Sequence, residues 1–136
     1  MSEITALGID LAKSVFELHG VDGRGVCVLR RQLRRAQVLR FFAQLPACLV
    51  GMEACGGAHY WAREINKLGH RVKMMPPQYA KGFVRGQKTD RNDAQGICEA
   101  ALRPQLPEVA VKSEEQQALL ALHRIRELLG KQDQQL

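Results

Sequence analysis

Ile4-Thr5-Ala6-Leu7-Gly8-Ile9-Asp10 is the stretch that decides the fold of this 136-residue chain. It is short and apolar, which is typical of a buried β-strand, and it ends on a carboxylate. A charge at Asp10 is costly in such a strand unless the carboxylate is paired or bound to a metal ion. The stretch therefore predicts a buried first strand whose last residue is a candidate site residue.

The residues that follow predict two more strands. Residues 15–21 and 26–30 are apolar runs on either side of the turn sequence Asp22-Gly23-Arg24-Gly25. An Asp-Gly pair between two such runs favours a tight hairpin. The first thirty residues are therefore expected to form an antiparallel meander of three strands.

The next segments alternate between helix and strand. Residues 36–45 have apolar side chains at helical spacing and end before Pro46, and residues 58–68 show the same spacing before Gly69. Residues 48–53 and 71–75 are short apolar runs, the first expected to be parallel to the opening strand. Glu53 repeats the pattern of Asp10, an acid at the end of an apolar strand. The sequence therefore predicts an α/β fold, a mixed sheet with flanking helices.

A second acidic stretch is Gly86-Gln87-Lys88-Thr89-Asp90-Arg91-Asn92-Asp93-Ala94. It follows a predicted loop at residues 76–79 and leads into a predicted helix at 94–102. Asp90 and Asp93 are three residues apart, which places them on one helix face, where they repel unless a cation or a proton is shared. The alternative is that Thr89 or Asp90 caps the helix and Asp93 occupies its first turn, where the helix dipole favours an acid.

The order of elements is that of the ribonuclease H architecture, an analogy at the level of the fold. In that architecture, acids at the ends of the first and fourth strands converge with acids on a later helix. Hard divalent cations take oxygen ligands, and a pair of such ions can activate one oxygen of a phosphodiester reaction and stabilise another. We therefore expect Mg²⁺ or Mn²⁺ at four acids: Asp10, Glu53, Asp90 and Asp93.

Three ordered motifs resemble the N-terminal RuvC-like DEDD domain of IS110-type insertion-sequence transposases, which are relatives of the Piv and MooV DNA invertases. The motifs are Gly8-Ile9-Asp10-Leu11-Ala12-Lys13, Glu53-Ala54-Cys55-Gly56-Gly57 and Lys88-Thr89-Asp90-Arg91-Asn92-Asp93-Ala94. The resemblance implies that the four acids are the catalytic metal-binding set. It also implies a DNA substrate, a guide RNA, a coiled-coil segment and a second domain with a nucleophilic serine, which nothing in this sequence matches.

The basic residues form two clusters in a chain with a formal net charge of +6. Lys81, Arg85, Lys88 and Arg91 flank the acids, and we expect them to contact the nucleic-acid backbone. The other cluster is Arg30, Arg31, Arg34, Arg35 and Arg40. For it, a solvated basic face and a phosphate-contacting role are equally open.

Residues 1–103 are expected to form the RuvC-like domain, and 113–136 the start of a helical coiled-coil segment. Ser113 and Gln116 form a capping box that opens this helix. Apolar residues then recur at heptad spacing, at Ala118, Leu122, Ile125 and Leu129. We expect a homodimer or a higher oligomer through this seam; the alternative is an amphipathic helix that packs on its own domain. Because no C-cap closes the helix, we expect it to continue in a longer chain.

Several classes of protein are disfavoured. No apolar run reaches the roughly 18 residues that cross a membrane, and no secretory signal is present, so we expect a cytoplasmic protein with reduced thiols. The scattered Cys and His residues predict no zinc site. An actin-like or sugar-kinase ATPase fragment lacks the glycine-rich turn that should follow Asp10. A nucleic-acid-binding or assembly module without catalysis stays open as the alternative.

Overall fold

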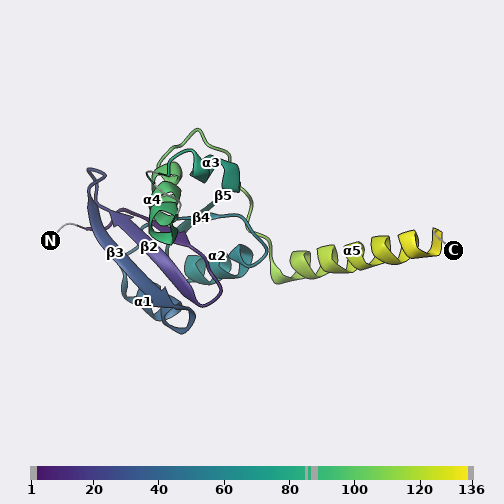
Figure 1. The fold of residues 1–136 in the computed structure, drawn as a ribbon. Helices are drawn as coiled ribbons and strands as arrows, with labels where there is room; N and C mark the ends of the chain where they lie inside the picture. The colour runs from purple at the N-terminus through teal and green to yellow at the C-terminus, as the bar shows by residue number, and fades with distance from the viewer. Residues whose placement is uncertain (1–2, 85, 87–88, 135–136) are drawn as a thin grey trace.

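A five-stranded mixed sheet organises the structure, a computed structural model that describes residues 3–84, 86 and 89–134 and only the backbone of 90, 91 and 131–134. The strands are β1 (Ala6–Asp10), β2 (Val15–Val21), β3 (Cys27–Arg34), β4 (Leu49–Glu53) and β5 (Arg71–Met75). Around them lie η1 (Arg35–Gln37), α1 (Val38–Gln44), α2 (Ala58–Lys67), α3 (Pro77–Lys81) and α4 (Asp90–Ala101), and the chain ends with α5 (Glu114–Gln134) (Figure 1).

The sheet has the order β3-β2-β1-β4-β5. β1, β2 and β3 form the predicted antiparallel meander, and β1, β4 and β5 run parallel to one another. The prediction that the first and fourth strands are parallel neighbours is confirmed. A parallel crossover needs a helix between its strands, and α2 supplies it between β4 and β5.

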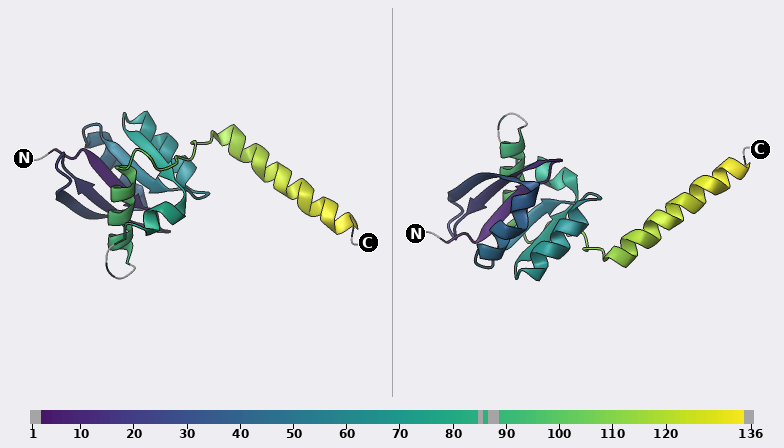
Figure 2. Two further views of the ribbon diagram at one scale, coloured as in Figure 1. Left: turned by 90° about the horizontal axis from the view of Figure 1, so that it is seen from above. Right: turned by 90° about the horizontal axis from the view of Figure 1, so that it is seen from below.

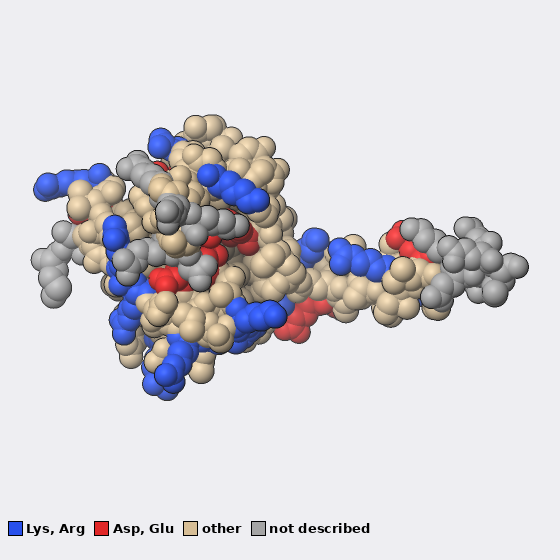
Figure 3. Space-filling model, in the orientation of Figure 1, with Lys and Arg blue, Asp and Glu red and all other residues tan. Residues whose placement is uncertain are grey.

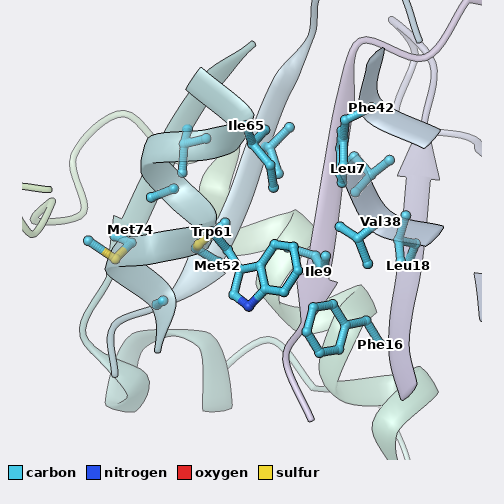
Figure 4. Close-up of a cluster of buried hydrophobic side chains, with 14 of the residues drawn as sticks. Leu7, Ile9, Phe16, Leu18, Val38, Phe42, Met52, Trp61, Ile65 and Met74 are labelled. Atoms are coloured by element: carbon cyan, nitrogen blue, oxygen red, sulfur yellow. The ribbon is translucent and has the colours of Figure 1, made fainter. Parts of the chain in front are cut away.

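Successive residues of a strand point to opposite faces, so the sheet has two different cores. On one face, Leu7 and Ile9 of β1 meet α1 and α2 in the larger core, and both are fully buried. This core mixes aromatic and branched side chains (Figure 4). Its labelled members are Leu7, Ile9, Phe16, Leu18, Val38, Phe42, Met52, Trp61, Ile65 and Met74.

The opposite face of the sheet is covered by α4, with α3 beside it (Figure 2). Here the core is made largely of small or unbranched side chains, among them Ala6, Met75, Ala80, Cys98 and Ala101, and it also includes the branched Val21 and Ile97. Small residues let a helix lie close to a sheet. Burial raises the pKa of the Cys98 thiol in this core to about 12, and burial in the larger core raises that of Cys48 to about 11, so both thiols stay protonated.

Three local predictions were wrong. The third strand runs to Arg34 instead of ending at residue 30, because a strand at the sheet edge tolerates exposed polar side chains on both faces. The segment at 76–79 is the short helix α3, which Pro77 begins at a position where its missing N–H costs nothing. The helix expected from Ala36 begins as the 3₁₀ turn η1 and becomes α-helical at Val38.

The segment between α4 and α5 is fixed to the domain before α5 leaves it. Val109 donates its N–H to the Met74 carbonyl at 2.8 Å, which adds one bridge at the edge of β5. Arg63 of α2 donates to the Lys112 carbonyl at 2.6 Å and to Gln117 Oε1 at 2.8 Å. The predicted capping box at Ser113 and Gln116 is present. α5 therefore starts from a held position and projects away from the sheet (Figure 2).

Among the described residues, no helix is both long and apolar enough to cross a membrane.

His59 makes the attachment of this segment sensitive to pH. Its buried ring accepts a hydrogen bond at Nδ1 from the Lys112 N–H at 3.0 Å. Burial first, and then the charges of Lys112 and Arg63, lower the pKa of His59 below its usual 6.5. Because the folded state disfavours the proton, stability should be complete above about pH 6.5 and decline as the pH falls toward the folded-state pKa.

Thermal melts at neutral pH and at about pH 5 measure this effect. We expect His59→Asn, whose amide oxygen can still accept the hydrogen bond, to reduce the loss of melting temperature on acidification. His19 is also buried and its pKa is likewise lowered, so part of the loss should remain. His123→Asn on the exposed face of α5 is the control. An equal effect of the His59 and His123 substitutions would contradict the role of His59.

Candidate metal centre

Asp10 and Glu53 end two adjacent parallel strands. The register of β1 and β4 pairs Gly8 with Gly51, and each strand ends two residues after this pair. Since the spacing is the same in both strands, the two acids come at the same end of the sheet, two residues beyond the last pair of the ladder. Both side chains are half-buried. The prediction that the first and fourth strands end together is therefore confirmed, and the convergence of their acids on one site stays a prediction.

Two glycines bring α4 against these strands. A Cβ atom at Gly8 would lie 2.5 Å from the backbone nitrogen of Cys98, and one at Gly51 would lie 2.6 Å from the Ala101 Cβ. Both contacts are far inside van der Waals range, so only glycine fits at these positions. Alternation along the strands places Asp10 on the same face as Gly8, and Glu53 on the same face as Gly51. Both acids therefore belong to the face that α4 covers.

The N-terminal turn of α4 carries the other two predicted acids. Thr89 caps the helix, its Oγ1 accepting from the Asn92 N–H at 3.1 Å, so Thr89 and not Asp90 is the N-cap. Asp90 is the first helical residue, one turn before Ala94, whose backbone lies against Gly8. Asp93 is half-buried in the same turn. The two interpretations are thus compatible, because Thr89 caps the helix and leaves Asp90 and Asp93 available for an acidic site.

A hollow of about 290 Å³ lies beside Asp93, lined by Lys81, Val84 and Gly86. It brings one predicted basic residue, Lys81 at the end of α3, next to one predicted acid. Of the other predicted basic residues, Arg85 and Lys88 lie outside the described residues, and Arg91 is described only as a backbone position in α4. A cation and a carboxylate around one hollow suit an anionic ligand held beside a metal ion.

The C-terminal end of α4 is fixed by a residue that the sequence did not single out. Lys73 of β5 is 7% exposed, and its Nζ donates to the carbonyls of Ala101 at 3.3 Å and Arg103 at 2.8 Å. A lysine ammonium at this end complements the helix dipole and satisfies carbonyls that have no helical partner. The signal in the sequence was a lysine at an inward position of an apolar strand.

The described side chains do not by themselves complete a metal site. Among them, no three His, Cys, Asp or Glu residues form a group able to hold a metal ion, and the Asp90 side chain lies outside the description. Figure 3 shows acidic side chains gathered near the middle of the domain, with Lys and Arg around them. The four-acid metal site therefore stays a prediction, and the structure supplies the strands and the helix that carry it.

The fold and this end of the sheet define a mixed α/β domain with an acidic helix packed over two acid-ending parallel strands. Residues 7–136 match the family model of IS110-type DEDD transposases, described as a transposase. The chain belongs to this transposase family, as the motifs around Asp10, Glu53 and Asp90 indicated.

Curated relatives carry the same description. The chain is 57% identical over 126 residues to a probable family 20 transposase of Pseudomonas aeruginosa, covering 93% of this chain and 37% of the relative. It is 45% identical over 129 residues to the transposase for insertion sequence element IS1328 of Yersinia enterocolitica, covering 95% and 39%. It is 44% identical over 131 residues to the transposase for IS1111A of Coxiella burnetii, covering 96% and 36%. The chain thus spans little more than a third of the length of these relatives.

The close approach at Gly8 gives a direct test of how α4 is seated. Gly8→Ala should destabilise the fold by about 1–3 kcal/mol, because the added methyl group meets backbone atoms that cannot move independently. Gly56→Ala is the matched control, since its Cβ would have nothing within 4 Å and its backbone is not left-handed. Urea unfolding measures both free energies. If the two variants are equally stable, α4 is not held against β1 at this point.

Proposed function

We propose that this chain is the metal-binding part of a DNA transposase that acts in strand cleavage and transfer during transposition. One observation carries the proposal: β1 and β4 end side by side on acids, on the face against which α4 packs. The sheet order supports an assignment to the ribonuclease H-like, RuvC-like group of folds. Family membership supports transposition as the process.

Asp10, Glu53, Asp90 and Asp93 would hold Mg²⁺ or Mn²⁺ in this proposal. Carboxylate oxygens are the ligands these ions prefer, and a bound ion would stabilise charge on a phosphodiester oxygen. Strand pairing positions the first two acids, and the Thr89 cap fixes the turn that carries the other two. The full reaction would also need the remaining part of the transposase, which the family resemblance places in a second domain with a serine nucleophile.

DNA is the proposed substrate, and a guide RNA the proposed partner. Lys81, Arg85, Lys88 and Arg91 would contact the phosphate backbone beside the acids, and Lys81 already lines the hollow next to Asp93. Each such contact releases counterions, so binding would weaken as salt rises. A transposase that acts on bacterial DNA works in the cytoplasm, which we propose as its location.

Metal binding is the first test of this function. Millimolar Mg²⁺ or Mn²⁺ should raise the melting temperature, and at ten times Kd the stabilisation is about 1.4 kcal/mol. Asp10→Asn should abolish most of the shift. Glu3→Gln removes the same charge at an exposed position before β1 and should leave the shift intact. No heat in calorimetry and no change in melting would sink the metal assignment and favour a binding or assembly module without catalysis.

We also propose that α5 pairs with the α5 of a second copy. Its apolar side chains are exposed, with Leu122 at 55%, Ile125 at 53% and Leu129 at 55%. They recur at coiled-coil spacing, and an exposed apolar stripe of this kind marks a partner surface. A dimer would bring two candidate metal centres into one assembly, which suits a reaction on two DNA strands.

The oligomeric state tests the pairing. We expect a concentration-dependent dimer by analytical ultracentrifugation, because short coiled coils are marginal. Leu122→Glu with Leu129→Glu should give a monomer that still binds metal. Leu119→Glu with Leu128→Glu adds the same charge at exposed leucines outside the heptad columns and should weaken the dimer less. A wild-type chain that is monomeric at high concentration would rule out self-pairing through α5.

A further inference from the structure

A second hollow lies on the face of the sheet opposite α4. It has a volume of about 590 Å³ and is lined by Arg35, Ala36, Leu39, Tyr60 and Trp61. These residues come from η1, α1 and the first turn of α2. None of them belongs to the predicted acidic site, and the basic cluster at residues 30–40, whose role the sequence left open, supplies Arg35.

Two aromatic rings line this hollow, and each lies edge-on to a neighbouring ring. Trp61 is 5% exposed and lies edge-on to Phe16, with ring centroids 5.1 Å apart. Tyr60 lies edge-on to Trp61 at 5.0 Å and is 42% exposed. The buried tryptophan therefore supports a tyrosine ring that remains open to solvent.

A guanidinium group forms another wall. The Arg35 guanidinium lies 5.4 Å from the Trp61 centroid and 5.9 Å from the Phe16 centroid. Its Nη1 donates to the Lys13 carbonyl at 3.2 Å, in the turn that follows β1. Arg35 thus contacts two aromatic rings and a neutral carbonyl, and among the described residues no carboxylate forms a salt bridge with it.

The charge around the hollow is positive. Within the described part of the chain, no salt bridge involves Arg30, Arg31, Arg34, Arg35 or Arg40. Lys13 and Arg34 are exposed beside Arg35. The planar guanidinium of Arg35 and the exposed ring of Tyr60 suit a nucleobase, because every base has a flat face that can stack. The neighbouring cations suit the phosphates, because every phosphodiester linkage carries a negative charge.

The hollow also lies at the end of the sheet that carries the predicted acids. η1 follows the last residue of β3, α2 begins five residues after the end of β4, and Lys13 comes three residues after Asp10. The carboxyl ends of β1, β3 and β4 lie at the same end of the sheet. A nucleic-acid single strand that passes over this end of the sheet from the acids would reach Arg35 and Tyr60.

We infer that this hollow binds an unpaired nucleobase of a single-stranded nucleic acid, with Tyr60 and Arg35 contacting the base and Lys13 and Arg34 its flanking phosphates. The inference rests on the proposed function only for the source of this single-stranded nucleic acid. The binding itself requires no metal ion, so it is tested separately.

Trp61 is the chain's only tryptophan, and its fluorescence reports directly on the hollow. The chain is titrated with a short single-stranded oligothymidylate in EDTA, and fluorescence is read together with the anisotropy of a label on the oligonucleotide. We expect the emission of Trp61 to change in step with binding. An abasic strand of the same length and a duplex should bind more weakly and change the emission little.

Substitutions separate the base contact from general attraction. Tyr60→Ala should weaken binding of the single strand about tenfold, which is typical of the loss of one stacked base, and Tyr60→Phe should retain it. Leu68→Ala is the control, since Leu68 is an apolar residue at the end of the same helix with a similar exposed fraction, 39%. Arg34→Gln, which removes a proposed phosphate contact, should weaken binding and reduce its salt dependence.

Four results would each overturn the inference: no binding of the single strand, binding without a change in Trp61 emission, equal binding of the abasic strand, or equal effects of Tyr60→Ala and Leu68→Ala. Failure of metal binding leaves all four readouts unaffected. A nucleobase site without a metal centre would point to a binding module, and a metal centre without the nucleobase site would leave the transposase proposal intact.

Discussion

The seating of α4 on β1 and β4 is the contact on which the rest of the structure depends. Gly8 and Gly51 face each other across two parallel strands, and their lack of side chains lets the α4 backbone approach the sheet directly. Each glycine stands two residues before an acid. Alternation along a strand then forces the acid onto the same face as its glycine. The helix that closes the small core is therefore also the helix that carries the two other predicted acids, Asp90 and Asp93.

The two faces of the sheet have different roles, one in stability and the other in placing the candidate site. The face under α1 and α2 holds the bulky core, where burial of large apolar side chains supplies most of the favourable free energy. The face under α4 holds Val21, Met75 and Ile97 among several alanines, a cysteine and two glycines, and the small residues bury less apolar area but permit close approach. Lys73 compensates there by binding the free carbonyls at the end of α4. Stability thus comes mainly from one face, and the placement of the candidate site from the other.

The sequence predicted the features that depend on local pattern. Apolar runs and the Asp-Gly turn located the five strands, and acids at two strand ends located the candidate site. The sequence could not show that Gly8 meets Ala94 and Cys98, because that contact joins residues more than eighty positions apart. The sequence predicts a loop at residues 76–79 because consecutive prolines disfavour regular structure, although Pro77 is suited to begin a helix and does so in α3. The end of β3 was missed because a run of arginines shows no alternation.

The segment before α5 explains how a projecting helix can matter to a site it does not touch. The bridge of Val109 to β5 and the contacts of Arg63 fix the start of α5 to the same domain that carries the acids. If α5 pairs with a second copy, the relative position of two acidic sites follows from these attachments and not from a flexible linker. Because the start of α5 is already fixed to the domain, pairing of two α5 helices would cost less conformational entropy than pairing of helices on flexible linkers. The hydrogen bonds around Lys112 therefore connect the geometry of the domain to the geometry of any assembly built on α5.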